Sequence, residues 1–211
     1  MQYSTFAAID IGSYDVILEI FEISKKQGIR SVDKICHRME LGKDTYTLGK
    51  IRPEMEEELC RVLADFVRIM EGYRVDDYRA AASSAISEAS NSLYVLGKIH
   101  QLTGLSVTVL SNSEQRFLSY KALAAMEDNF NKIIEKGTAI LDLDGGSFQI
   151  SLFDKDALVT TQNIRMGSLR IRERLAGIQS ETEHYEEMVE ELIWNEVSSF
   201  KKMYLKDRKI E

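Results

Sequence analysis

Two stretches with the same order of features decide the fold: Ile9-Asp10-Ile11-Gly12-Ser13 near the start of the chain, and Leu141-Asp142-Leu143-Asp144-Gly145-Gly146-Ser147 in its second half. In each, a buried apolar strand ends in an aspartate, a glycine turn follows, and a second strand alternates apolar and polar residues. Glycine supplies the positive φ that short hairpin turns demand. The sequence therefore predicts an internal repeat, each half of which begins with a β-hairpin.

The segments around these hairpins continue each half with a third strand and then helices. In the first half we expect helices at 53–72, 91–102 and 113–126, a loop at 41–51, a turn at 83–86, and strands at 6–10, 16–23, 29–39, 78–82 and 107–110. In the second half we expect helices at 168–175 and from about Thr182 to Tyr204, and strands at 138–143, 148–153 and 158–164. The polar stretch from Asp128 to Gly137 is the best candidate boundary, which predicts a first lobe over residues 1–127 and a second over 128–211.

The composition is that of a soluble globular protein, with 44% hydrophobic and 29% charged residues and a net charge of −7. The acidic balance argues against nucleic acid as a partner. The start of the chain lacks a signal-peptide pattern, and no apolar run approaches the ~18 residues of a membrane span. Cys36 and Cys60 predict reduced, buried thiols in a cytoplasmic protein. The three histidines lack metal-ligand spacing, so a zinc site is not expected.

The repeated strand–turn motif carries the residue types of a magnesium–phosphate site. Asp10 and Asp142 end the first strand of each half and are candidate metal ligands, because magnesium keeps most of its waters and needs few carboxylates. Backbone N–H groups and hydroxyls of the turns are candidate phosphate ligands: Gly12, Ser13, Gly145, Gly146 and Ser147. The alternative is that the acids merely end strands and the glycines merely make turns. The duplication favours the functional interpretation.

Five sequence blocks occur in the order of a known family: Asp10-Ile-Gly-Ser-Tyr-Asp15, Ala82-Ser-Ser-Ala-Ile-Ser-Glu-Ala-Ser-Asn91, Leu110-Ser-Asn-Ser-Glu-Gln-Arg-Phe117, Asp142-Leu-Asp-Gly-Gly-Ser-Phe-Gln149 and Arg165-Met-Gly167. They resemble D-[IL]-G-S-N-S, A-T-S-A-x-R-E-A-x-N, I-S-G-x-E-E-A-R, D-I-G-G-G-S-T-E and R-M-G of the exopolyphosphatase/guanosine pentaphosphate phosphatase (Ppx/GppA) family. That family belongs to the actin/sugar-kinase/Hsp70 superfamily. The blocks cover residues 6 to about 170.

The resemblance implies an α/β fold of duplicated ribonuclease H-like (actin-like ATPase) lobes, with mixed sheets flanked by helices and the two hairpins facing one cleft. Relative to the family, the second lobe is expected to be incomplete, and a homodimer or a missing segment could cover the apolar surface it exposes. The activity implied is magnesium-dependent hydrolysis of phosphoanhydrides, in polyphosphate or a guanosine polyphosphate.

The departures from the family fall where the resemblance places the chemistry. Gln115 stands where the family has the glutamate thought to activate water, and Gln149 stands where it has a second acid. Ser87 replaces a phosphate-binding arginine, Tyr14 replaces an asparagine, and Asp144 replaces the first glycine of the triple. A glutamine cannot accept a proton, which forfeits general-base catalysis worth ~10²–10⁴-fold. Asp144 adds a charge that repels phosphate.

Some remaining residues could compensate for these losses. Glu114 precedes Gln115, but on a helix it is rotated by ~100° and cannot take over the same role without a shift of the turn. Glu88 keeps an acid of the family pattern, and Arg116 could replace a lost cation. A solvated first helical turn is the simpler interpretation of Glu114 and Arg116.

Three functions remain open from the sequence. The first is a phosphoanhydride hydrolase whose degenerate site is weak or inactive, that is, a pseudoenzyme. The second is a non-catalytic module that senses a phosphate-rich ligand or binds another protein. The third is a kinase of the same superfamily, which would need an adenosine pocket from a part of the second lobe that these residues do not contain.

Overall fold

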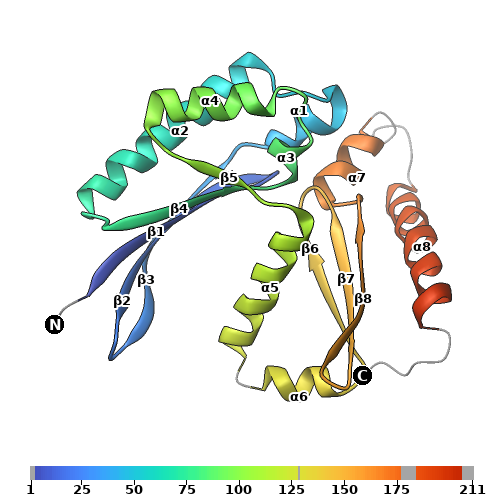
Figure 1. The fold of residues 1–211 in the computed structure, drawn as a ribbon. Helices are drawn as coiled ribbons and strands as arrows, with labels where there is room; N and C mark the ends of the chain where they lie inside the picture. Colours follow the sequence, from blue (N-terminus) through green and yellow to red (C-terminus); the bar gives the residue numbers. More distant parts are fainter. Residues whose placement is uncertain (1–2, 128, 177–183, 206–211) are drawn as a thin grey trace. The chain divides into compact units, whose positions relative to one another are not determined.

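The protein is described by a computed structural model covering residues 3–127, 129–176 and 184–205. The chain divides into two compact units, unit 1 (Met1–Ser111) and unit 2 (Asn112–Glu211). Each unit has its own sheet and hydrophobic core, flanked by helices (Figure 1). The α/β class with mixed sheets is therefore confirmed.

Unit 1 contains a five-stranded sheet in the order β3-β2-β1-β4-β5. Strands β1 (Ser4–Ile11), β2 (Asp15–Ser24) and β3 (Gly28–Arg38) form an antiparallel meander. Strand β4 (Asp77–Ala82) runs parallel to β1, and β5 (Val107–Val109) runs parallel to β4. This order and these directions are those of the ribonuclease H-like sheet expected from the sequence.

The core of unit 1 lies where the central strands meet the helices. Buried and more exposed residues alternate along β1 and β2. The residues that face the core are at most 2% exposed: Ala7, Ile9, Ile11, Val16, Leu18 and Ile20. Helices α2 (Pro53–Gly72) and α4 (Ser92–Thr103) pack side by side over this layer (Figure 1). Between them Lys98 Nζ pairs with the buried Glu56 carboxylate at 2.5 Å. The predicted helix at 53–72 has the bounds of α2.

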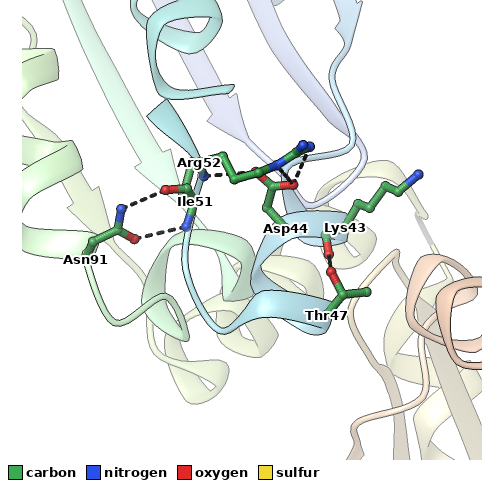
Figure 2. Close-up of polar contacts among 6 residues, drawn as sticks. All are labelled: Lys43, Asp44, Thr47, Ile51, Arg52 and Asn91. Atoms are coloured by element: carbon green, nitrogen blue, oxygen red, sulfur yellow. Dashed lines mark hydrogen bonds and ion pairs between the residues drawn. The ribbon is translucent and has the colours of Figure 1, made fainter. Parts of the chain in front are cut away.

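The expected loop at 41–51 was wrong, because its first part forms helix α1 (Leu41–Leu48). Tertiary contacts hold this helix in place. The buried Asp44 carboxylate accepts hydrogen bonds from the Arg52 backbone N–H and Nε, both at 2.9 Å. The Asn91 side-chain amide accepts a hydrogen bond from the Ile51 N–H and donates one to the Ile51 carbonyl (Figure 2). This pair of bonds fixes the segment between α1 and α2. These buried partners offset the cost of Gly42 inside the helix.

Unit 2 begins with α5 (Asn112–Met126) and α6 (Phe130–Glu135), followed by an antiparallel sheet in the order β6-β7-β8. The strands are β6 (Thr138–Leu143), β7 (Phe148–Asp154) and β8 (Ala157–Ile164). Helices α7 (Ser168–Leu175) and α8 (Tyr185–Tyr204) close the described part. The expected start of the last helix at Thr182 lies outside the described residues.

Different helices cover the two faces of the unit 2 sheet. On one face, α5 reaches the strands through hydrogen bonds of Ser119 to Asp142 and of Tyr120 to Ser151. On the other face, residues of β7, β8, α7 and α8 form the second core, which is centred on Ile150, Leu152, Ile164, Leu175 and Phe200. On that same face β6 presents Leu141 and Leu143, which are 70% and 67% exposed. Among the described residues β6 pairs only with β7, whereas its counterpart β1 pairs on both edges.

The boundary expected at 127/128 differs from the division of the structure at Ser111. Helix α5 groups with unit 2 because its polar residues bond to β6 and β7, and the expected linker region holds helix α6. The expected turn at 83–86 forms a short helix, α3 (Ser84–Ser87). None of the described helices is both long enough and apolar enough to cross a membrane.

Candidate functional site

The two glycine turns predicted as a repeat are closed by the same hydrogen bond. In unit 1 the Gly12 N–H donates to the Asp15 carbonyl at 3.0 Å. In unit 2 the Asp144 N–H donates to the Ser147 carbonyl at 3.0 Å. The strand ends before the turns also correspond, since Asp10 precedes Ile11 in β1 as Asp142 precedes Leu143 in β6. Gly12 and Asp144 are therefore equivalent positions.

In unit 1 the candidate residues gather at the carboxyl ends of two parallel strands. Ile11 of β1 lies beside Ala82 of β4, so the turn after β1 and the segment after β4 meet at one edge of the sheet. Asp10 is exposed at this edge. Gly12 does not have the positive φ expected of a hairpin glycine. The position favours glycine for lack of space instead, because a Cβ there would lie 2.9 Å from the Asp15 carbonyl oxygen.

The hydroxyl of Ser13 belongs to a closed ring of three hydroxyl groups. Ser13 Oγ lies 2.6 Å from Tyr46 Oη and 3.2 Å from Ser84 Oγ, and Tyr46 Oη lies 2.9 Å from Ser84 Oγ. Either hydroxyl of each pair can donate, and each has one proton to give. Ser13 is only 5% exposed. A phosphate that took the Ser13 proton would therefore compete with Tyr46 and Ser84 for it.

Tyr46 and Ser84 are site residues that sequence reasoning missed. Tyr46 lies on α1, a segment that was predicted to be a loop because it contains glycines. No pattern in the sequence pairs Tyr46 with Ser13. Ser84 belongs to the block that resembles A-T-S-A, but the sequence predicts no role for it. The predicted phosphate contact Ser87 ends α3 and is exposed, and Glu88 follows it, half-buried.

In unit 2 the candidate residues converge from α5, β6 and β7. Asp142 is directly opposite Gln149 in the antiparallel register, so both side chains lie on the face that α5 covers. The Ser119 hydroxyl donates to the Asp142 carboxylate at 2.9 Å, a contact that the sequence did not reveal. Gln149 is buried. Ser119 follows Gln115 by one helical turn, which brings both to the same side of α5.

The carboxylate of Asp144 occupies the donors of its own turn. Its Oδ1 accepts hydrogen bonds from the backbone N–H groups of Gly146 at 2.6 Å and of Ser147 at 2.8 Å. Its Oδ2 accepts a bond from the Gln115 amide at 3.3 Å. These two backbone N–H groups are the ones predicted to bind phosphate, so a phosphate would have to displace a side-chain carboxylate from them. Gln115 acts here as a donor to an acid.

The carbonyl groups of the same turn are held by the start of α7. The N–H groups of Ser168 and Leu169 donate to the carbonyls of Asp144 and Gly145, both at 3.0 Å. Arg170 Nε donates to the Gly146 carbonyl at 2.9 Å. A Cβ at Gly167 would lie 2.5 Å from both the Asp144 oxygen and the Gly145 carbon, so the R-M-G block packs its glycine against the turn. The turn is thereby fixed on both its donor and acceptor sides.

The neighbours of Gln115 on α5 point elsewhere. Glu114 is exposed, whereas Gln115 is half-buried against the turn. Arg116 donates to the hydroxyls of Ser113 at 3.2 Å and of Thr161 at 3.5 Å. The ~100° rotation between consecutive helical residues accounts for this difference.

The acidic side chains Asp10 and Asp142 fit only a magnesium site that has few protein ligands. Among the described residues no cluster of three or more acidic, histidine or cysteine side chains could enclose a metal. Magnesium is often held by one or two carboxylates together with substrate phosphates and water. Asp10, exposed at a strand end, and Asp142, half-buried beside Ser119, suit that mode. The common cleft expected from the sequence stays a prediction.

A family model supports the resemblance described above. The model of the Ppx/GppA phosphatase family matches residues 19–210. Among solved structures, the Ppx/GppA family member of Aquifex aeolicus aligns with a TM-score of 0.70 at 23% identity, covering 94% of this chain and 63% of that one. At this identity the structural likeness concerns the fold.

Curated proteins with similar sequences carry phosphatase names. The bifunctional 3-dehydroquinate synthase/phosphatase of Fusobacterium nucleatum is 22% identical over 174 residues, which are 80% of this chain and 26% of that protein. Exopolyphosphatase 1 of Mycobacterium leprae is 25% identical over 144 residues, which are 68% of this chain and 41% of that protein. The chain thus spans less than half the length of these relatives.

Proposed function

The chain belongs to the Ppx/GppA phosphatase family, and we propose that it is a phosphoanhydride hydrolase domain whose site binds polyphosphate-type anions but hydrolyses them weakly or not at all. The observation that carries the proposal is the position of Gln115, whose amide donates to Asp144 beside the second turn. A neutral amide cannot take a proton from water. Gln149, the other replaced acid, is buried next to Asp142 and also cannot do so.

The family and the relatives named as exopolyphosphatases support this substrate class. Polyphosphate and guanosine polyphosphates share a chain of phosphoanhydrides, which backbone N–H groups and magnesium recognise without reading the rest of the molecule. Magnesium would neutralise phosphate charge, and Asp10 and Asp142 are the carboxylates we assign to it. The turn at Gly12 and Ser13 is the other phosphate ligand that we assign, because its first residue, unlike Asp144, has no carboxylate to compete with phosphate for the backbone N–H groups of the turn. A cytoplasmic location and a homodimer complete the proposal.

A non-catalytic module is the second candidate function. The hydrogen bonds from the Gly146 and Ser147 N–H groups to Asp144 favour this function, because donors that already bind a carboxylate of the chain are not available to a substrate phosphate. Such a module would sense a phosphate-rich ligand through unit 1, or bind another protein.

Phosphate release tests the proposed hydrolase domain with its weakened site. The chain would be incubated with magnesium and either polyphosphate or guanosine pentaphosphate, alongside the triple variant Gln115→Glu, Gln149→Glu, Asp144→Gly. We expect little or no release by the natural chain, a measurable gain in the triple variant, and no change in the control Glu127→Gln, an exposed residue beyond α5. Turnover by the natural chain at ~1–10³ per second would overturn the proposal. Loss of that turnover in Glu114→Gln would then identify Glu114 as the base.

A further inference from the structure

The segment that follows β3 is fastened to the first glycine turn. The N–H groups of Met39 and Glu40 both donate to the Tyr14 carbonyl at 3.0 Å. The Gly42 N–H donates to the Ser13 carbonyl at 2.8 Å. These bonds bring the end of β3 and the start of α1 to the turn that we assign to phosphate.

The same segment is the source of positive charge at this turn. Of the three segments that meet there, residues 10–15 and 83–88 contain no lysine or arginine, whereas residues 38–43 contain Arg38 and Lys43. Lys43 is exposed and extends away from α1 (Figure 2). Arg38 is the cation whose orientation the turn itself determines.

Two residues next to the turn orient the guanidinium of Arg38. Its Cζ lies over the Tyr14 ring, 4.5 Å from the ring centre, and its Nε lies 3.8 Å from Asp15 Oδ1. The second distance is longer than a hydrogen bond, so the ion pair orients the group without using its N–H donors. The Arg38 side chain is 68% exposed. A guanidinium held over an aromatic ring, with its edge open to solvent, is arranged to bind phosphate through paired N–H groups.

The sheet register places Arg38 on the same face as Asp10. Asp10 is opposite Ile17 of β2, and Arg38 is opposite Asp15, two residues before Ile17. Residues directly opposite each other, and residues two apart on one strand, share a face of the sheet. Because β2 lies between β1 and β3, the Cα atoms of Asp10 and Arg38 are roughly 10–12 Å apart. That separation suits a chain of phosphates, with magnesium on Asp10 at one end and Arg38 at the other.

We propose that Arg38 binds the phosphate chain at the first turn, and that Tyr14 is a positioning residue that holds the Arg38 guanidinium in place. The inference rests on the proposed function, because it adds a cation to the phosphate site of unit 1. The ligand class is a linear polyphosphate that lies along the face of the sheet between Asp10 and Arg38. An asparagine, which the family pattern has at position 14, offers no ring for a guanidinium to stack on.

Isothermal titration calorimetry with tripolyphosphate and magnesium tests the role of Arg38. Arg38→Gln should raise the dissociation constant roughly tenfold or more, because a paired, charge-assisted contact is lost. Arg38→Lys should raise it less, since the charge stays and only the planar fork is lost. The matched control is Arg30→Gln, which removes the same charge from the other end of β3, where Arg30 pairs with Glu22 at 2.6 Å. It should leave the affinity unchanged.

Tyr14 is tested by its coupling to Arg38. Tyr14→Phe keeps the ring and should bind tripolyphosphate as the natural chain does, whereas Tyr14→Leu should raise the dissociation constant roughly threefold. In a chain that already carries Arg38→Gln, Tyr14→Leu should have no further effect, because the group that it positions is gone. An equal effect of Tyr14→Leu in both backgrounds would overturn the positioning role. Circular dichroism checks that each variant is folded.

The outcomes separate this inference from the proposed function. If Arg38→Gln binds tripolyphosphate as tightly as the natural chain, the assignment of Arg38 is wrong and the phosphate site stands without it. If the natural chain does not bind tripolyphosphate with magnesium, the phosphate site itself is refuted, and Arg38 with it. The loss in Arg38→Gln should also be smaller for orthophosphate than for tripolyphosphate, and an equal loss for both anions would overturn the placement of a chain between Asp10 and Arg38.

Discussion

The carboxylate of Asp144 accepts a hydrogen bond from the backbone N–H of Gly146 at 2.6 Å, across a turn whose counterpart in unit 1 begins with Gly12. The repeat has thus kept its backbone geometry but not its chemistry. At one copy the first turn residue has no side chain, and at the other an anionic side chain fills the donors. The two halves of the repeat should therefore differ in how they treat phosphate.

Replacing Asp144 by Gly should strengthen binding of tripolyphosphate in the presence of magnesium by roughly tenfold, because two backbone donors are freed and a repelling charge is removed. Asp144→Asn is the matched control, since its carbonyl oxygen can still accept both bonds without the charge. It should show the smaller gain. Isothermal titration calorimetry measures both affinities. Equal affinity in all three proteins would mean that the turn takes no part in binding.

Replacing Tyr46 by Phe should destabilise unit 1 by about 1–2 kcal/mol, because two hydroxyl partners in a part-buried ring are lost. Ser13→Ala should cost a similar amount. The double variant should cost about 0.5–1 kcal/mol less than the sum, because both changes remove the same 2.6 Å bond. Urea unfolding gives the free energies. Tyr94→Phe, at an exposed tyrosine, is the control, and full additivity of the first two changes would argue against the ring.

Replacing Gly167 by Ala should destabilise unit 2 by about 1–3 kcal/mol, because the added methyl group meets the backbone of residues 144 and 145. Gly97→Ala is the comparison within a helix, where a Cβ meets nothing within 4 Å. There alanine should stabilise by about 0.5–1 kcal/mol. Thermal unfolding measures both changes in stability, which should have opposite signs. A neutral Gly167→Ala would show that the turn gives way to the methyl group.

The two cysteines should react at different rates with a thiol reagent. Cys36 is exposed, contrary to the expectation that both are buried, and Cys60, on α2, is buried in the unit 1 core. Burial raises the pKa of the Cys60 thiol, so at any pH below that pKa the reactive thiolate is scarcer than for a free cysteine. One thiol should be titrated in the native protein and both in urea. Cys36→Ser should abolish the fast phase; two fast thiols in the native protein would contradict the assignment.

Most of the fold could be predicted from the sequence because its signals are local. The alternation of Val16, Leu18 and Ile20, and the helical period opened by Pro53, depend on nearby residues alone. The segment at 41–51 could not be predicted, because α1 is held by Asp44 and Thr45 contacting distant groups. The grouping of α5 with unit 2 could not be predicted for the same reason. The bond that links α5 to the unit 2 sheet joins Ser119 to Asp142, and α6 lies between these two residues in the sequence.

The candidate site was predictable in its positions and not in its contacts. The motif spacing located Asp10, Gly12, Asp142 and Gly146, and the departure at Asp144 was visible as a change of charge. That charge was expected to repel a ligand, whereas the structure shows it bonded to the turn. An Asp two or three residues before available N–H groups can form this local ring. Which acceptor a turn uses depends on side-chain rotamers that spacing does not specify.

The parallel pairing of β1 with β4 has a consequence for the order in which the protein folds. Ile9 can pair with Ala80 only after the residues of α1 and α2 have been synthesised. Each strand pair described in unit 2 instead joins two strands that are consecutive in the sequence. Long-range pairing incurs its loop-closure entropy before any contact rewards it, so the unit 1 sheet is the slow step. On the ribosome, β1 waits several seconds for β4 at about 5–20 residues per second. During that time the edge of β1 that later pairs with β4 is open to pairing with other chains.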